Sequence, residues 1–103
     1  MKQEVEWPRM NDVLTEKELK IVNEIIGEQL EVRPEQLTPE AHLEQDLRAD
    51  SLDKVEISMT IEDRFNINAP DAAWDGVDTV GDVYDALANV LRPEAGRQVT
   101  NVR

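Results

Sequence analysis

Apolar residues recur at helical spacing in three stretches of this chain, and no stretch shows the alternation of a half-buried strand. The first predicted helix begins at Thr15, because Thr15 and Glu18 form a capping box that satisfies backbone donors of the first turn. The second spans about residues 50–65. The last begins at Thr79, whose hydroxyl caps it together with Asp82 three residues on, and Pro93 stops it. The pattern therefore predicts an all-α fold.

A long connection, residues 31–49, separates the first two predicted helices, and Pro34 and Pro39 prevent it from continuing as a helix. A loop of this length inside a compact domain is unusual and is often functional. We expect its apolar residues to pin it to the body of the domain: Val32, Leu37, Ala41, Leu43 and Leu47.

A short additional helical turn is predicted at residues 71–74, which gives a small four-helix bundle with a long loop between its first two helices. The chain is long enough for one domain with one modest core. We expect this domain at residues 14–92, between a flexible N-terminal arm at 1–13 and a flexible C-terminal tail at 93–103.

The second predicted helix carries two apolar stripes on opposite sides when successive residues are placed about 100° apart around its axis. The core stripe, expected to face the domain interior, contains Ile57, Ile61 and Phe65. The outer stripe contains Leu52, Val55 and Met59. It either packs beneath the long connection or binds a partner. Bordering acids suit a partner, since charge steers the encounter and apolar side chains hold it: Asp50, Asp53, Glu56 and Asp63.

The formal net charge is −12, from 23 acidic and 11 basic residues. Nucleic acid and anionic membrane surfaces are therefore poor partners, and a protein with a basic patch is the natural complement. The absence of cysteine excludes disulfides and thiolate catalysis. No apolar run approaches the length of a membrane span, and the N-terminus lacks the apolar region of a signal peptide. We expect a cytoplasmic monomer that does not insert into membranes.

Ser51 begins the second predicted helix, with Asp50 as the N-cap residue. A phosphate on its hydroxyl would face free backbone N–H groups and the positive end of the helix dipole. A catalytic serine would instead need a base, and the candidates are His42 in the connection and Lys54. Nothing around Ser51 resembles a nucleophile elbow, so a group-carrying site is preferred to a serine hydrolase. The nearby acids do not match an EF-hand loop, and no metal site is expected.

The segment ADSLDKVEISMTIEDRF, residues 49–65, resembles the phosphopantetheine attachment region of acyl carrier proteins, where D-S-L precedes an acidic amphipathic helix. The sequence IIGEQL at residues 25–30 is similar to the first helix of that family, and TVGDVYDAL at 79–87 is similar to its last. The tripeptide alone is weak, whereas the ordered set of segments, covering about residues 15–92, is a strong resemblance.

The resemblance implies that Ser51 receives 4′-phosphopantetheine, donated from coenzyme A by a separate phosphopantetheinyl transferase, and that the chain is not itself an enzyme. The terminal thiol of this arm would carry acyl groups as thioesters between acyl-transferring or synthase enzymes of fatty acid, specialised lipid or polyketide synthesis. These partners would present basic docking patches. The implied recognition surface comprises Asp50, Leu52, Asp53, Val55, Glu56 and Met59.

Several residues depart from the family pattern. Arg48 stands where the family usually has a glycine, and Lys54 reduces the negative charge. Ser58 and Thr60 are polar where apolar or small residues are common. Trp74 replaces a usually small residue and either packs in the core or lines an acyl or partner site. These departures favour a specialised carrier over one for bulk fatty acid synthesis. The alternatives are an unmodified acidic adaptor that binds through the outer stripe, or an aminoacyl or peptidyl carrier.

Overall fold

The computed structural model of the chain describes residues 14–92, and the predictions for the arm, the tail and Trp7 lie outside these residues. Within them the fold is all-helical, and the only β-type pairing is an isolated bridge. The α-helices are α2 (Glu16–Leu30), α3 (Ser51–Phe65) and α4 (Val80–Leu91). Two 3-10 helices, η2 (Pro34–Gln36) and η3 (Asp71–Trp74), lie between them. The all-α prediction is confirmed, although the short third helix predicted at residues 71–74 is a 3-10 helix, so the structure has three α-helices within residues 14–92.

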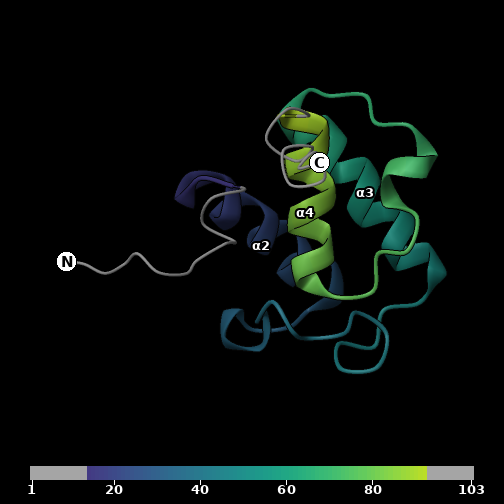
Figure 1. The fold of residues 1–103 in the computed structure, drawn as a ribbon. Coiled ribbons are helices and arrows are strands. Elements are labelled where there is room, and N and C mark those ends of the chain that lie inside the picture. The colour runs from purple at the N-terminus through teal and green to yellow at the C-terminus, as the bar shows by residue number, and fades with distance from the viewer. Residues whose placement is uncertain (1–13, 93–103) are drawn as a thin grey trace, which may run out of the picture.

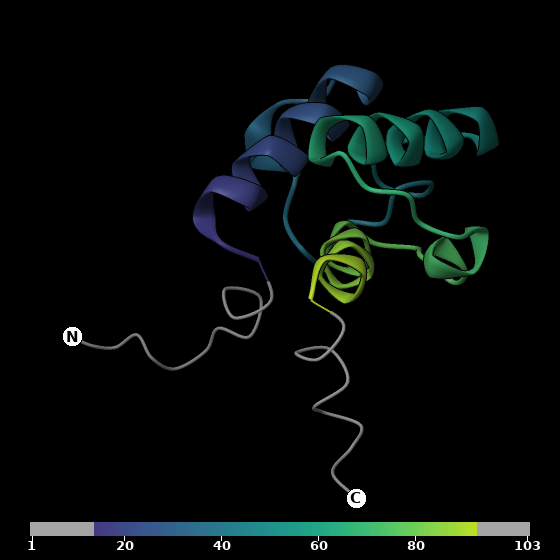
Figure 2. The same ribbon diagram turned by 90° about the horizontal axis from the view of Figure 1, so that it is seen from above.

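The helices form two layers. In Figures 1 and 2, α2 and α3 lie side by side, and α4 lies across from them with η3 beside it. The core fills the space between the layers and receives side chains from all three α-helices and from the long connection. Its largest fully buried side chains are Leu14, Val22, Ile26, Leu43, Ile61, Val80 and Leu87. None of the helices in residues 14–92 is long and apolar enough to cross a membrane.

The helices begin at the predicted residues because the predicted caps form. Thr15 Oγ1 accepts a hydrogen bond from the backbone N–H of Glu18 at 3.1 Å, and the Glu18 carboxylate accepts one from the Thr15 N–H at 2.9 Å. Thr79 and Asp82 make the equivalent pair at the start of α4. Helix α3 ends at Asn66, whose left-handed φ of 56° is the conformation expected of an asparagine C-cap.

The long connection is pinned to the body as predicted. Leu37, Ala41, Leu43 and Leu47 are buried, and Val32 packs against the core. Backbone hydrogen bonds also join the connection to the start of α4. The Leu43 N–H donates to the Asp78 carbonyl at 2.8 Å, and the Val80 N–H donates to the Ala41 carbonyl at 3.0 Å. The connection therefore arrives at α3 from a fixed position, which matters for the residue that begins α3.

Candidate functional site

Ser51 is the first residue of α3 and is exposed. Asp50, the N-cap residue, accepts a hydrogen bond from the Asp53 backbone N–H at 2.8 Å, and the Asp53 carboxylate accepts one from the Asp50 N–H at 3.1 Å. The hydrogen bond from the Asp50 N–H has the largest effect in lowering the pKa of the Asp53 carboxyl, and a hydrogen bond from Gln29 lowers it further. This reciprocal pair fixes the first turn and leaves the Ser51 hydroxyl outside the helical hydrogen-bond ladder.

The turn before Asp50 contains one residue with an unusual backbone angle. Arg48 has a φ of 64°, in the left-handed region that side-chain-bearing residues rarely adopt. Ala49 is buried, and its N–H donates to the Leu43 carbonyl at 2.8 Å. A glycine, which the resemblance implies at position 48, would adopt this positive φ without strain.

The outer stripe does not pack beneath the connection. Leu52, Val55 and Met59 are 63%, 51% and 61% exposed, whereas Ile57 and Ile61 of the core stripe are 3% and 0% exposed. These exposed fractions exclude burial of the outer stripe beneath the connection, which was one of the two alternatives that the sequence left open. The outer stripe begins one residue after Ser51 and forms an apolar surface along the solvent side of α3.

The acids beside this stripe are partly held by a residue that the sequence did not single out. The Gln29 side-chain amide, from α2, donates to Asp53 at 3.1 Å and to Glu56 at 2.7 Å. The contact joins residues 24 and 27 positions apart, so no local motif signals it. Only the packing of α2 against α3 brings these groups together.

Both candidate bases make contacts with residues other than Ser51. The Lys54 ammonium donates to Glu44 at 2.6 Å and lowers the pKa of that carboxyl. His42 pairs through its backbone with Thr79, and its charge adds to the hydrogen bonds, chiefly from the Asp78 N–H, that lower the pKa of Asp82. Within residues 14–92 no group of three or more candidate ligands could hold a metal ion.

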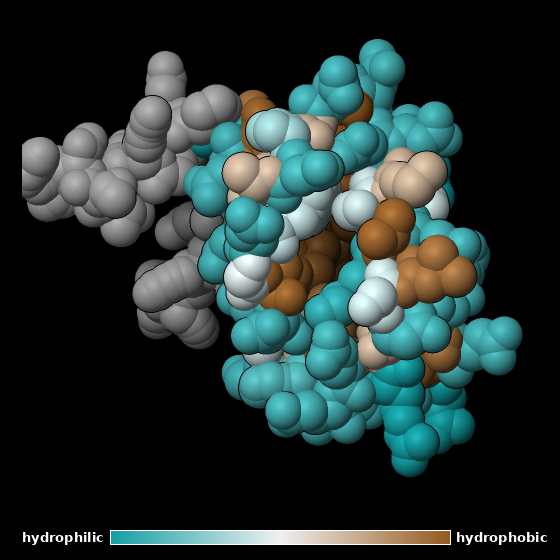
Figure 3. Space-filling view, turned by 90° about the vertical axis from the view of Figure 1, so that its right-hand side faces the viewer, coloured by the Kyte–Doolittle hydropathy of each residue, from teal (hydrophilic) through white to brown (hydrophobic). Residues whose placement is uncertain are grey.

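A cavity of about 810 Å³ opens between α3 and the segment containing η3. Figure 3 shows this face as a hollow with apolar side chains in its depth, and with both polar and apolar side chains around its edge. Val55 and Met59 line the cavity, so the outer stripe continues into it. The residues Asn68, Asp71, Asp75 and Asp78 add polar lining that the sequence did not indicate.

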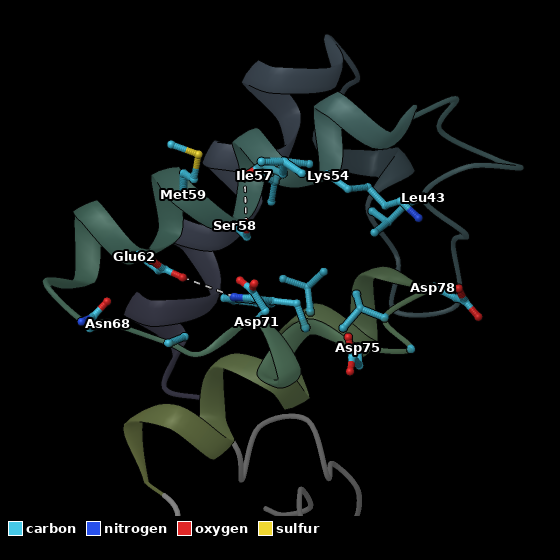
Figure 4. A pocket seen from close by; sticks show the side chains of 16 residues that line it. Leu43, Lys54, Ile57, Ser58, Met59, Glu62, Asn68, Asp71, Asp75 and Asp78 are labelled. Atoms are coloured by element: carbon cyan, nitrogen blue, oxygen red, sulfur yellow. Dashed lines mark hydrogen bonds between the residues drawn. The ribbon is translucent and has the colours of Figure 1, made fainter.

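Trp74 has a place in both the core and the cavity. It packs against the core and also lines the cavity. Its indole N–H donates to the Glu62 carboxylate at 3.3 Å across the space between η3 and α3, the contact drawn as a dashed line from Glu62 in Figure 4. Ser58, another departure from the family pattern, also lines the cavity, and its hydroxyl donates to the Val55 carbonyl at 2.8 Å. Its donor is therefore satisfied inside the helix.

An exposed serine at a helix N-terminus, beside an apolar stripe and a cavity, is consistent with the helical carrier domain that the sequence resemblance implies. Residues 20–87 match the family model described as "Phosphopantetheine attachment site". The chain is 44% identical over 71 residues to an acyl carrier protein of Thermosynechococcus vestitus, covering 69% of this chain and 88% of that protein. It is 47% identical over 62 residues to an acyl carrier protein of Wolinella succinogenes, covering 60% and 82%. The chain belongs to the acyl carrier protein family.

As a member of this family, the protein is an acyl carrier with a covalently attached 4′-phosphopantetheine group, and the unmodified adaptor is not favoured. The thiol of that group supplies the thioester bond to the acyl cargo. The start of α3 fits its attachment, because the Ser51 hydroxyl is exposed and the helix N-terminus favours the negative charge of a phosphodiester. Family membership also implies interaction with a phosphopantetheinyl transferase and acyl-processing enzymes.

Proposed function

We propose that Ser51 is the attachment residue of the 4′-phosphopantetheine group. The observation that carries this proposal is the exposed hydroxyl at the N-terminus of α3, one residue before the exposed outer stripe. The two aspartates next to it are engaged with each other's backbone N–H groups, so the turn that presents Ser51 is already ordered. A transferase would therefore meet a preformed substrate segment.

We propose further that the recognition surface consists of the outer stripe and the acids Asp50, Asp53 and Glu56. Exposed apolar side chains bordered by acids suit transient docking to a basic patch, which is what successive partner enzymes require. The flexible side chain of Met59 would let this surface adapt to several partners.

We propose that the cavity between α3 and η3 shelters the acyl group. Its volume of about 810 Å³ lies within the range of small-molecule sites. Trp74 and the polar residues in its lining make the cavity less uniformly apolar than a long alkyl chain would favour. This supports a specialised carrier over one that serves bulk fatty acid synthesis, with lipid or polyketide intermediates as cargo.

The remaining parts of the proposal concern the whole chain. We place the carrier domain at residues 14–92, acting as a cytoplasmic monomer without catalytic activity of its own. The Lys54 ammonium is engaged in an ion pair with Glu44, and among residues 14–92 no hydrogen bond joins Ser51 to Lys54 or His42.

Intact-mass measurement after incubation with a phosphopantetheinyl transferase and coenzyme A tests the attachment. The protein should gain one phosphopantetheinyl group, and Ser51→Ala should gain none. Ser58→Ala is a matched control on the same helix and should load like the unaltered protein. A mass that does not change, or a gain that persists in Ser51→Ala, would refute the assignment.

A further inference from the structure

Gln29, on α2, contacts two of the acids that lie beside Ser51 on α3. Its side-chain nitrogen, Nε2, lies 3.1 Å from Asp53 Oδ1 and 2.7 Å from Glu56 Oε1, within hydrogen-bond distance of both. Because an amide –NH₂ group has two protons, it can donate one to each carboxylate. A single neutral side chain on α2 thus links two acids that stand on successive turns of α3.

The link determines where both carboxylates point. The two oxygens of Asp53 are taken up by different partners, since Oδ1 accepts from Gln29 and Oδ2 accepts from the Asp50 N–H. Glu56 is held through Oε1 alone, which leaves Oε2 for a partner. Without Gln29, Glu56 would have no other hydrogen-bond partner among residues 14–92 and would sample several rotamers.

A neutral donor at this position also preserves charge. A lysine or arginine here would hold the same two carboxylates while cancelling one of their two negative charges. Lys54 does this to Glu44 nearby. The amide of Gln29 orders Asp53 and Glu56 and leaves their full charge available to a basic partner.

We propose that Gln29 is a positioning residue for partner recognition: it presents the Glu56 carboxylate, and through Asp53 the first turn of α3, in a preordered and fully charged form to basic enzymes. This inference rests on the proposed role of the acids in recognition. This positioning should lower the entropic cost of binding, because a side chain fixed before docking has less conformational freedom to lose.

Steady-state loading of the full chain by a phosphopantetheinyl transferase tests the proposal. Gln29→Met keeps nearly the same side-chain shape and removes both donors. It should raise KM by about two- to tenfold, the cost of ordering one or two side chains, and leave kcat unchanged. Its salt dependence should match that of the unaltered protein, since no charge changes. Asn89→Met, at an exposed position of α4, is the matched control and should alter neither constant.

Gln29→Lys separates positioning from charge. It retains donors for both carboxylates but adds a cation, so kcat/KM should fall at low salt, and the deficit should shrink as salt screens the charge. Asn89→Lys adds the same charge on the other layer and should have the smaller effect. Thermal unfolding of each variant below the assay temperature would identify any that fail to fold.

Each outcome bears on a different claim. An unchanged KM in a folded Gln29→Met, while the unaltered protein loads normally, would overturn the positioning role alone. A fall in kcat with KM unchanged would also overturn it, because a preordered docking group acts on binding. Failure of the unaltered protein to load would instead refute the proposed attachment at Ser51, and the inference with it.

Discussion

The two faces of α3 use similar residues for opposite purposes. Ile57 and Ile61 on the core stripe are almost fully buried, while Leu52, Val55 and Met59 on the outer stripe are more than half exposed. Burial of a large aliphatic side chain contributes about 1.5–3 kcal/mol to folding, a contribution that the outer stripe largely forgoes. The difference shows that one face maintains the fold and the other remains available for a partner.

Truncation on each face should separate these purposes, and the largest effect is expected in the core. Ile61→Ala should cost about 2–5 kcal/mol of stability, because it leaves a cavity at a fully buried position. Met59→Ala, on the exposed face of the same helix, should change stability by no more than about 0.5 kcal/mol. Urea denaturation of both variants checks the comparison, and equal losses would mean that the outer stripe also supports the fold.

The outer face should respond in partner recognition instead. Leu52→Ala should lower kcat/KM for loading by about five- to thirtyfold, as expected when a central apolar contact worth 1–2 kcal/mol is lost. Its unfolding temperature should stay close to that of the unaltered protein. Thr60→Ala, exposed on the same helix outside the stripe, is the control. A normal loading rate in Leu52→Ala would remove the outer stripe from the recognition surface.

The turn before Ser51 should gain stability if its strain is relieved. Arg48→Gly should stabilise the protein by about 0.5–1 kcal/mol, because a left-handed residue costs about 1–2 kcal/mol and glycine's greater chain entropy offsets only part of that gain. Arg33→Gly, where φ is −86°, should destabilise by a similar amount. Denaturation midpoints of the two variants should therefore move in opposite directions, and parallel shifts would contradict this.

The smallest expected effect concerns acid sensitivity in the layer opposite the outer stripe. Hydrogen bonds, chiefly from the Asp78 N–H, lower the pKa of Asp82. The ionised Asp82 carboxylate therefore contributes to folding stability above the ordinary carboxyl pKa, and this contribution is lost as pH falls through the lowered value. Partial burial, together with the Asp82 charge, raises the pKa of Asp85, which gives the opposite sign.

At pH 7 Asp82→Asn should therefore lower stability and Asp85→Asn should raise it, each by less than about 1 kcal/mol because both carboxylates are well solvated. Below pH 3 both differences should shrink. Denaturant titrations at the two pH values check this, and a stabilising Asp82→Asn at pH 7 would contradict the assignment.

Features that depend on contacts between residues close in the sequence could be predicted, and features that depend on contacts between distant residues could not. Helix starts were predictable because their caps are local, as at Thr15 and Thr79. Periodicity also identified both stripes of α3, but it could not decide whether the connection covers the outer one. The answer depends on the path of the connection, which is fixed by the burial of Leu37 and Leu43 in the core.

Contacts across the fold carried no sequence signal. The Gln29 link joins α2 to α3, and the Trp74–Glu62 contact joins η3 to α3, so both depend on tertiary packing. The left-handed backbone at Arg48 could not be predicted for a different reason, because arginine rarely adopts a positive φ and its presence does not indicate such a turn. The resemblance pointed to that position only as a departure from glycine.

The central claim is that α3 presents Ser51 as the attachment residue beside a surface kept free for partners. The most direct measurement is peptide mapping by mass spectrometry of the chain isolated from its own host. The account predicts one phosphopantetheinyl group, located on the peptide that contains Ser51 and absent from every other peptide. A group on a different residue, or a chain that is entirely unmodified in its host, would contradict it.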